Sequence, residues 1–203
     1  MHIALFGATG GTGQQVLTQA IEQGHTLTAL VRAPSRLPAR PELTTISGDV
    51  LDLAAVTACV AGADAVVCAL GSHGSKTPIE ALGTERILAA MQEPGVRRII
   101  VVTSLGVGDS REQIAWPFRL IMDLTLKPIM AAKAEQERLV KASGLDWTIV
   151  RPGGLTDGPK TGRYRFGLDR SLKGSRISRA DVAEFVLRQL TDETSLHRTP
   201  AVT

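Results

Sequence analysis

The first stretch after Met1 reads His2-Ile3-Ala4-Leu5-Phe6-Gly7-Ala8-Thr9-Gly10-Gly11-Thr12-Gly13, an apolar run of strand length that meets four glycines. The next segment, 14–23, has apolar residues at helical spacing: Val16, Leu17, Ala20 and Ile21. Glycines between a strand and a helix let backbone N–H groups approach a phosphate, and the helix dipole adds about half a positive charge there. The stretch therefore predicts the phosphate loop of a dinucleotide site. A tight turn without a ligand is the alternative.

The glycine spacing is Gly7-x-x-Gly10-x-x-Gly13, with Gly11 as an additional glycine, and differs from G-x-G-x-x-G. Such a pattern alone is weak evidence for a ligand. Its position in the first strand–helix unit is more informative, because a doubly wound sheet places its phosphate loop there.

The composition favours one globular domain, 1–203, without a nucleic-acid surface or a metal site. The chain has 203 residues, 43% hydrophobic and 21% charged, with a net charge of +3. Aromatic residues make up 3% and no dense basic tract is interleaved with them, which argues against nucleic-acid binding. The histidines are scattered, so no metal site is predicted.

The cysteines and the apolar runs indicate a cytoplasmic protein. Cys59 and Cys68 lie in apolar segments without metal-ligand spacing, which predicts reduced core residues. No apolar run approaches the roughly 18 residues of a membrane span. The N-terminus runs directly into a strand, so we expect no targeting peptide. We further expect no membrane partner and a monomer or weak homodimer.

Strand and helix patterns alternate along the chain. Strands are predicted at 2–6, 26–31, 43–47, 65–70, 98–102 and 147–150, and helices at 14–23, 51–60, 78–92, 131–142 and 178–190. This alternation predicts a Rossmann-like α/β fold with a doubly wound, mainly parallel sheet.

Two segments fall outside this alternation, and both are expected to border the substrate. The segment 106–128 is predicted to be irregular and apolar, with an amphipathic helix over 116–126 as the alternative. The segment 152–178 contains a Gly-, Arg- and Lys-rich stretch at 158–174. Segments that follow the carboxyl ends of strands border the ligand crevice of such a sheet.

The end of the second strand favours NADPH over NADH. NAD-specific sites carry an acidic residue there, whereas this chain has Arg32 with Ser35 and Arg36 close by. Two guanidinium groups and a hydroxyl suit a 2′-phosphate; a solvated loop is the alternative. Asp49, after the third strand, is predicted either to meet the adenine or to cap the next helix.

The remaining strand ends are predicted to surround the reacting groups. The fourth strand ends at Leu70-Gly71, the fifth at Thr103-Ser104, and the sixth leads into 152–155. Ser104 is the leading candidate to face the substrate. Its alternative is a helix cap or a hydroxyl that bonds its own loop.

The chain resembles the atypical short-chain dehydrogenase/reductase group of NmrA-like NAD(P)-binding proteins, and within it the biliverdin-IXβ reductase/flavin reductase branch. The residues that carry the resemblance are Phe6-Gly7-Ala8-Thr9-Gly10, Thr12-Gly13, Leu30-Val31-Arg32, Ser35-Arg36-Leu37-Pro38, Gly48-Asp49-Val50-Leu51, Leu70-Gly71, Thr103-Ser104 and Ser143-Gly144-Leu145. The resemblance spans most of the chain.

The resemblance implies a set of cofactor contacts. The diphosphate would contact Gly7, Thr9, Gly10 and Thr12, together with the loop glycines Gly11 and Gly13. The 2′-phosphate would contact Arg32, Ser35 and Arg36, and the adenine would contact Asp49 and Val50. The nicotinamide would lie among Leu70, Gly71, Thr103, Ser104, Pro152, Gly153, Gly154 and Leu155.

The chain departs from this group at its usual proton donor. Many short-chain dehydrogenases use a Tyr-x-x-x-Lys pair, but Ile129 stands at the tyrosine position before Lys133, and Tyr164 is the only tyrosine. The biliverdin/flavin reductases also lack this tyrosine, yet often carry histidines where this chain has Lys133 and Gly154. A larger, more open site is therefore expected.

The missing tyrosine favours one class of reaction. Interconversion of alcohol and ketone needs a tuned acid or base, whereas a flavin or linear tetrapyrrole accepts hydride, spreads the charge and takes its proton from solvent. The sequence thus predicts an NADPH-dependent reductase of such acceptors, with Ser104 and Lys133 as candidate catalytic residues. The alternatives are an NADP(H)-binding redox sensor or assembly factor that docks through 116–126 and, third, an epimerase-like enzyme.

Overall fold

The computed structural model describes residues 1–33, 37–72, 78–92 and 95–203, in which an eight-stranded sheet has the order β3-β2-β1-β4-β5-β6-β10-β8. Its strands are β1 (His2–Phe6), β2 (Thr26–Val31), β3 (Leu43–Ser47), β4 (Ala65–Cys68), β5 (Arg98–Val102), β6 (Asp146–Pro152), β8 (Phe166–Gly167) and β10 (Ala201–Val202). All pairs are parallel except β10 with β8. The predicted Rossmann-like fold is confirmed.

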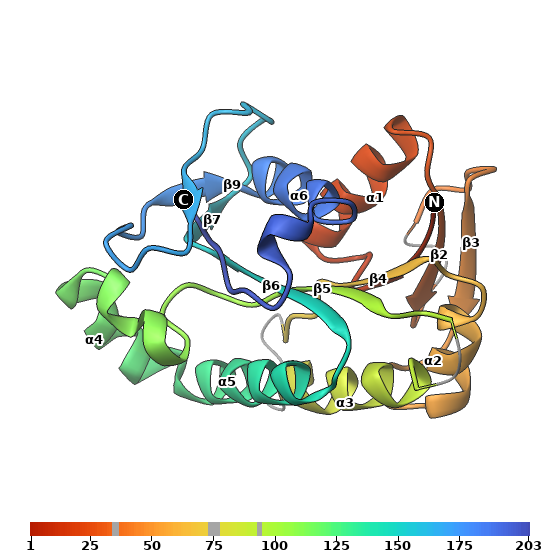
Figure 1. The fold of residues 1–203 in the computed structure, drawn as a ribbon, viewed down its shortest axis with the longest axis horizontal. Helices are drawn as coiled ribbons and strands as arrows, with labels where there is room; N and C mark the ends of the chain where they lie inside the picture. The colour runs from red at the N-terminus through yellow and green to blue at the C-terminus, as the bar shows by residue number, and fades with distance from the viewer. Residues whose placement is uncertain (34–36, 73–77, 93–94) are drawn as a thin grey trace.

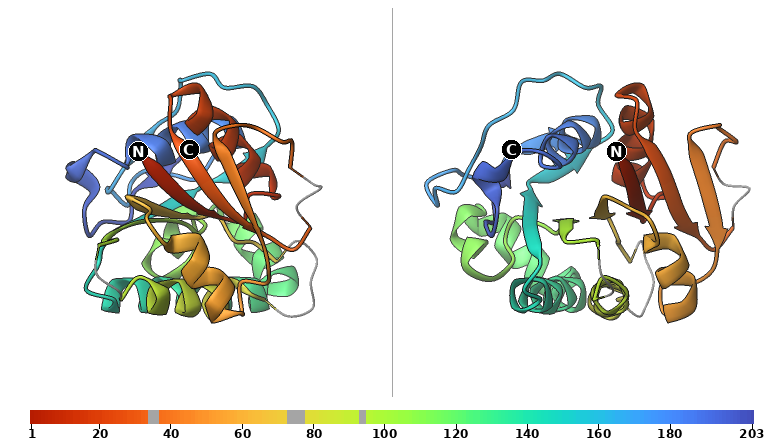
Figure 2. Two further views of the ribbon diagram at one scale, coloured as in Figure 1. Left: turned by 90° about the vertical axis from the view of Figure 1, so that its right-hand side faces the viewer. Right: turned by 45° about the vertical axis from the view of Figure 1, so that its right-hand side comes forward.

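Helices cover both faces of the sheet (Figure 1). One face carries α1 (Gly11–Glu22) and α6 (Arg179–Arg188); the other carries α2 (Leu53–Val60), α3 (Glu80–Ala90) and α5 (Lys127–Ala142). The two further views of Figure 2 show the same three layers. Helix α4 (Trp116–Thr125) lies at the end of the molecule near β6, and β7 (Gly154–Thr156) pairs with β9 (Arg176–Ser178) in a small second sheet.

Strand β1 shows how the sequence specifies a sheet that is buried on both faces. Ile3 and Leu5 belong to the core under α1 and α6, whereas Ala4 and Phe6 belong to the core over α2, α3 and α5. Successive side chains of a strand point to opposite faces, so an unbroken apolar run suits a parallel sheet covered twice. Both cysteines are free and buried, as predicted. In the described ranges no helix has the length and apolar character of a membrane span.

Two helices begin earlier in the chain than predicted. Helix α1 begins at Gly11 instead of residue 14, with Gly10 as its extended N-cap, so the last two loop glycines are helical. Helix α5 begins at Lys127 instead of 131, because Pro128 falls in its first turn, where the missing N–H costs nothing.

The segment 106–128 is predicted to be irregular, but the structure shows that most of it is helical. It contains a 3₁₀ helix at Gly108–Gln113 and then α4. The alternative interpretation, an amphipathic helix, is the observed one. Pro117 lies in the first turn of α4, again the position where proline favours a helix start.

The phosphate loop depends on a very close approach of α1 to the end of β1. A Cβ on Gly13 would lie 2.0 Å from the carbonyl oxygen of Gly7. Gly7 itself has a φ of +88°, and a Cβ there would lie 2.4 Å from the carbonyl oxygen of Ala69. Only glycine satisfies both requirements without displacing backbone.

A buried ion pair fixes the other half of the molecule. Arg151 on β6 contacts Glu137 on α5 through Nη2–Oε2 at 2.5 Å and Nε–Oε1 at 2.9 Å, and both side chains are 4% exposed. The Thr103 hydroxyl donates to Glu137 Oε1 at 2.9 Å, and Arg151 Nη1 donates to Asp109 Oδ1 at 2.7 Å. These bonds tie α5 to β6, to the end of β5 and to the 3₁₀ helix. Charges buried in this way require their full set of partners.

We predict that Gly13→Ala destabilises the fold by about 1–3 kcal/mol, the usual cost of overpacking, because the new methyl group meets backbone that cannot rotate away. Urea unfolding measures this change. Gly158→Ala is the matched control, since a Cβ there would lie 3.7 Å from its nearest neighbours. Equal unfolding midpoints for the two variants would contradict the proposed close approach.

Candidate functional site

A cavity of about 700 Å³, here called the phosphate-loop cavity, lies at the carboxyl ends of β1, β2 and β4. Nine residues of the predicted cofactor site line it: Gly7, Thr9, Gly10, Gly11, Arg32, Asp49, Val50, Leu70 and Gly71. The N-terminus of α1 also borders this space, so its free N–H groups and dipole favour an anion there. A cradle of glycines, a helix N-terminus and this volume fit the phosphates of a dinucleotide.

The predicted 2′-phosphate residues are described only in part. Arg32 is exposed and lines the phosphate-loop cavity at the end of β2. Ser35 and Arg36 lie outside the described residues. The contact of Arg32 with a 2′-phosphate stays a prediction.

The structure decides between the two roles predicted for Asp49, an adenine contact and a helix cap. Its Oδ1 accepts a hydrogen bond from the backbone N–H of Leu51 at 2.9 Å. Helix α2 is instead capped by Asp52, whose Oδ1 accepts from the N–H of Ala54 at 2.9 Å. Asp49 is therefore an exposed cavity-lining residue and not the helix cap.

Thr12 and Gly13 differ in position from the other loop residues. Thr12 is buried and lines the second cavity described below. Gly13 is buried at the contact of α1 with Gly7 and is absent from the described linings of both cavities. Its place in the structure is that of a packing residue.

Arg179 is a candidate phosphate-binding residue that the sequence analysis missed. It is the first residue of α6, and a Cβ on Gly11 would lie 2.7 Å from its Cδ and 2.9 Å from its Nε. Its Nη1 donates to Asp157 Oδ1 at 2.5 Å, and the Arg179 side chain is 25% exposed. A guanidinium group held directly over the glycine loop suits a diphosphate. No sequence motif links residues so far apart, so only the packing of α6 beside α1 reveals it.

A second cavity, of about 640 Å³ and here called the apolar cavity, adjoins the first and shares Gly10, Gly11 and the segment 69–72 with it. The predicted site residues that line it are Thr12, Leu70, Gly71, Thr103, Ser104, Lys133, Pro152, Gly153, Gly154 and Leu155. Its apolar wall comes from Leu105, Ile114, Met122, Leu126, Ile129 and Met130. Ile129, at the position of the usual tyrosine, is thus part of this wall.

The two hydroxyl groups at the end of β5 are both engaged. Ser104 is half-buried, and its hydroxyl donates to the carbonyl oxygen of Leu105 at 3.1 Å, which is the local bond that its alternative interpretation predicts. The Thr103 hydroxyl donates to Glu137, as described above. Ser104 therefore faces the cavity with its proton already donated to its own loop.

Lys133 and Glu80 are two of the charged residues in the cavity wall, beside Arg176 and Arg179. Burial lowers the pKa of the Lys133 ammonium below its ordinary range, and the nearby Glu80 carboxylate opposes that shift. Glu80 is fully buried and accepts from the N–H of Ser72 at 3.0 Å and from the Ser72 hydroxyl. Glu80 is not predictable from the sequence as a site residue, because a glutamate in the first turn of a helix is ordinary.

The two substrate-side segments contribute unequally. Helix α4 and the residues before it supply Ile114, Ala115 and Met122 to the apolar cavity. From the stretch 158–174, only Gly174 lines it, followed by Ser175 and Arg176. Gly158, Pro159, Thr161 and the segment 163–165 instead border a separate hollow of about 670 Å³, because the chain there turns toward β8 and β10. Within 152–178, the two ends of the segment therefore border the apolar cavity, and its role beside the substrate stays a prediction.

Comparisons with known proteins agree with this geometry. A family model described as NAD(P)H-binding matches residues 7–193. An uncharacterized chloroplastic protein of Arabidopsis thaliana is 34% identical over 201 residues, which cover 93% of this chain and 71% of that protein. YhfK of Bacillus subtilis, named an uncharacterized sugar epimerase, is 31% identical over 210 residues, which cover 98% of this chain and 92% of that protein.

Among solved structures, ChuY of Escherichia coli O157:H7, described as an anaerobillin reductase, superimposes with a TM-score of 0.85 at 25% identity. The match covers 100% of this chain and 96% of that one. The family model spans the glycine loop, both cavities and α6. The chain therefore belongs to the NAD(P)H-binding family, within the oxidoreductase-type proteins of the atypical short-chain dehydrogenase/reductase group.

Proposed function

We propose that this protein is an NADPH-dependent reductase that passes hydride to a planar conjugated acceptor, either a flavin such as FMN or a biliverdin-like tetrapyrrole. One observation carries the proposal: a largely apolar cavity continues directly from the phosphate loop and has Ile129 where a proton-donating tyrosine would stand. The resemblance to ChuY, described as an anaerobillin reductase, supports a bilin among the acceptors.

The cofactor, when bound, supplies a hydride and leaves oxidised. In the proposal, Arg32, Ser35 and Arg36 hold its 2′-phosphate, and the glycine loop with Arg179 holds its diphosphate. The carboxyl ends of β4, β5 and β6 then border its nicotinamide end.

The cavity walls suit a flat acceptor. Apolar side chains such as Ile114, Met122 and Met130 exclude water and orient an aromatic face by contact. A conjugated ring system spreads the charge of the added hydride and takes its proton from water, so the protein's main contribution is proximity and orientation. The Lys133 ammonium adds electrostatic stabilisation of that charge from the cavity wall.

One observation favours a second candidate function, a redox sensor or assembly factor that binds NADP(H) without turnover. The outer side of α4 exposes Trp116, Leu120 and Leu124 by 71%, 52% and 77%, which suits docking to a partner. An epimerase-like reaction, which the name of the Bacillus subtilis relative suggests, is third, because it needs the acid–base residue that Ile129 replaces.

We predict turnover with FMN, riboflavin or biliverdin and none with a simple ketone, because Ile129 stands at the position of the tyrosine that would protonate an alkoxide. The measurement is the loss of NADPH absorbance with each acceptor, with a quinone as a further member of the panel. Tight NADPH binding with no turnover on any acceptor would favour the sensor. Turnover of the ketone alone would contradict the reductase proposal.

We predict that Arg32→Glu weakens NADPH binding at least about tenfold more than NADH binding, because only NADPH carries the 2′-phosphate that the new carboxylate repels. Calorimetric titration of the variant with each cofactor measures the two dissociation constants. Arg86→Glu, an exposed charge reversal on α3, is the matched control. Equal losses for both cofactors would remove the 2′-phosphate assignment.

We predict that Arg179→Gln weakens NADPH and NADH binding alike, by roughly ten- to a hundredfold, because the diphosphate is common to both. The same titration measures this loss. Asp157→Asn, which removes the carboxylate that pairs with Arg179, should not weaken either cofactor. Unchanged affinity in Arg179→Gln would show that this guanidinium only covers the loop.

A further inference from the structure

A further, smaller cavity lies behind the apolar cavity, at the end of the molecule formed by α4 and the start of α5. Its volume is about 240 Å³, and it shares three wall residues, Ile114, Met122 and Met130, with the apolar cavity. We call it the cationic chamber. Because the same three side chains face both spaces, a ligand in the apolar cavity meets the chamber across a single layer of flexible apolar groups.

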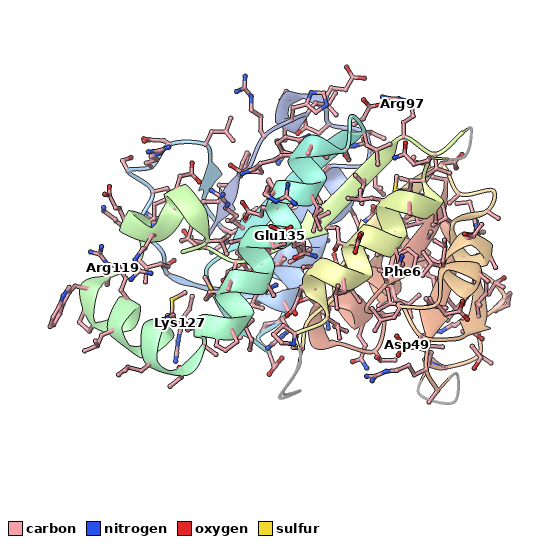
Figure 3. All side chains as sticks on the ribbon, turned by 90° about the horizontal axis from the view of Figure 1, so that it is seen from below. Phe6, Asp49, Arg97, Arg119, Lys127 and Glu135 are labelled. Atoms are coloured by element: carbon pink, nitrogen blue, oxygen red, sulfur yellow. The ribbon has the colours of Figure 1, made fainter. Side chains whose placement is uncertain are left out.

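The charged lining of the chamber is basic throughout. Arg111, Arg119 and Lys127 contribute to it, and its described lining contains no acidic residue. Figure 3 shows Arg119 on α4 and Lys127 at the start of α5, side by side at this end of the molecule. The Arg119 and Lys127 cations at this small space repel each other, so the site favours an anion between them.

Arg119 carries a buried donor that requires an acceptor. Its Nε is shielded from solvent and has no hydrogen-bond partner within the described part of the chain. A buried N–H of a charged group that lacks a partner costs free energy, and such groups in native proteins are normally satisfied by protein, water or ligand. An anionic oxygen placed in the chamber would satisfy it.

We propose that the cationic chamber binds an anionic substituent, a carboxylate or a phosphate, of the acceptor that is reduced in the apolar cavity. The inference rests on the proposed function and narrows its substrate class to planar acceptors with a charged tail. The flat, apolar part of the acceptor lies against Ile114, Met122 and Met130, and its tail reaches Arg119 and Lys127 beyond them. A neutral acceptor leaves the Arg119 donor unsatisfied.

The test compares acceptors that differ only in the anion. FMN is paired with riboflavin to probe a phosphate, and biliverdin with its dimethyl ester to probe carboxylates. For each pair, kcat/KM is measured with wild type, Arg119→Gln, Lys127→Gln and the control Arg86→Gln, which removes one exposed positive charge outside all three cavities. Thermal unfolding of each variant accompanies the kinetics.

We expect wild type to prefer the anionic member of at least one pair, and Arg119→Gln to reduce that preference about tenfold while Arg86→Gln preserves it. The pair that responds identifies phosphate or carboxylate as the ligand. Equal rates for both members of both pairs would overturn the inference and leave the reductase proposal intact. If Arg119→Gln unfolds at a lower temperature than wild type, Lys127→Gln, a change at an exposed residue, serves as the test instead. The same ratio of kcat/KM for the anionic and the neutral acceptor is then compared with that of wild type.

A binding measurement keeps the inference separate from the reductase proposal. Quenching of flavin fluorescence reports FMN and riboflavin binding to the NADP⁺-saturated protein without any turnover. If no acceptor is reduced, the reductase proposal fails. A preference for FMN that Arg119→Gln removes would then still support an anion site in the chamber, and equal affinities would overturn it.

Discussion

The contact between α1 and the end of β1 is the constraint on which the rest of the site depends. Because Gly13 has no Cβ, the first turn of α1 can lie directly against Gly7 at the end of β1. That approach directs the helix N-terminus at the phosphate-loop cavity and leaves Gly11 beneath Arg179. Any side chain at residue 13 would push the helix away and separate these groups.

The second constraint lies on the substrate side, in the buried pair of Arg151 and Glu137. Because Glu137 also accepts from Thr103, one carboxylate fixes the end of β5 and the inner face of α5 together. Lys133 lies one helical turn before Glu137 and so enters the apolar cavity from a fixed backbone. The cofactor half of the molecule thus depends on close backbone contacts at glycines, whereas the substrate half depends on a buried ion pair.

The sequence predicts what depends on local pattern. Uninterrupted apolar runs such as 65–68 predict buried parallel strands, and the glycines from Gly7 onward predict the loop. Features that arise from contacts between distant segments were not predictable. Arg179 reaches Gly11 only through the packing of α6, and β10 contributes two apolar residues, too few for a recognisable pattern. Glu80 looks like any helix-start glutamate until its burial beside Ser72 is seen.

Direct hydride transfer is the central claim, and deuterium tests it most directly. The two forms of NADPH deuterated on opposite faces of nicotinamide C4 would each be oxidised with an accepted flavin or bilin, and the NADP⁺ produced analysed by mass spectrometry. The account predicts complete loss of deuterium from one form, retention in the other, and slower turnover only for the form that loses it. Loss from both forms equally, or no oxidation of either, would contradict it.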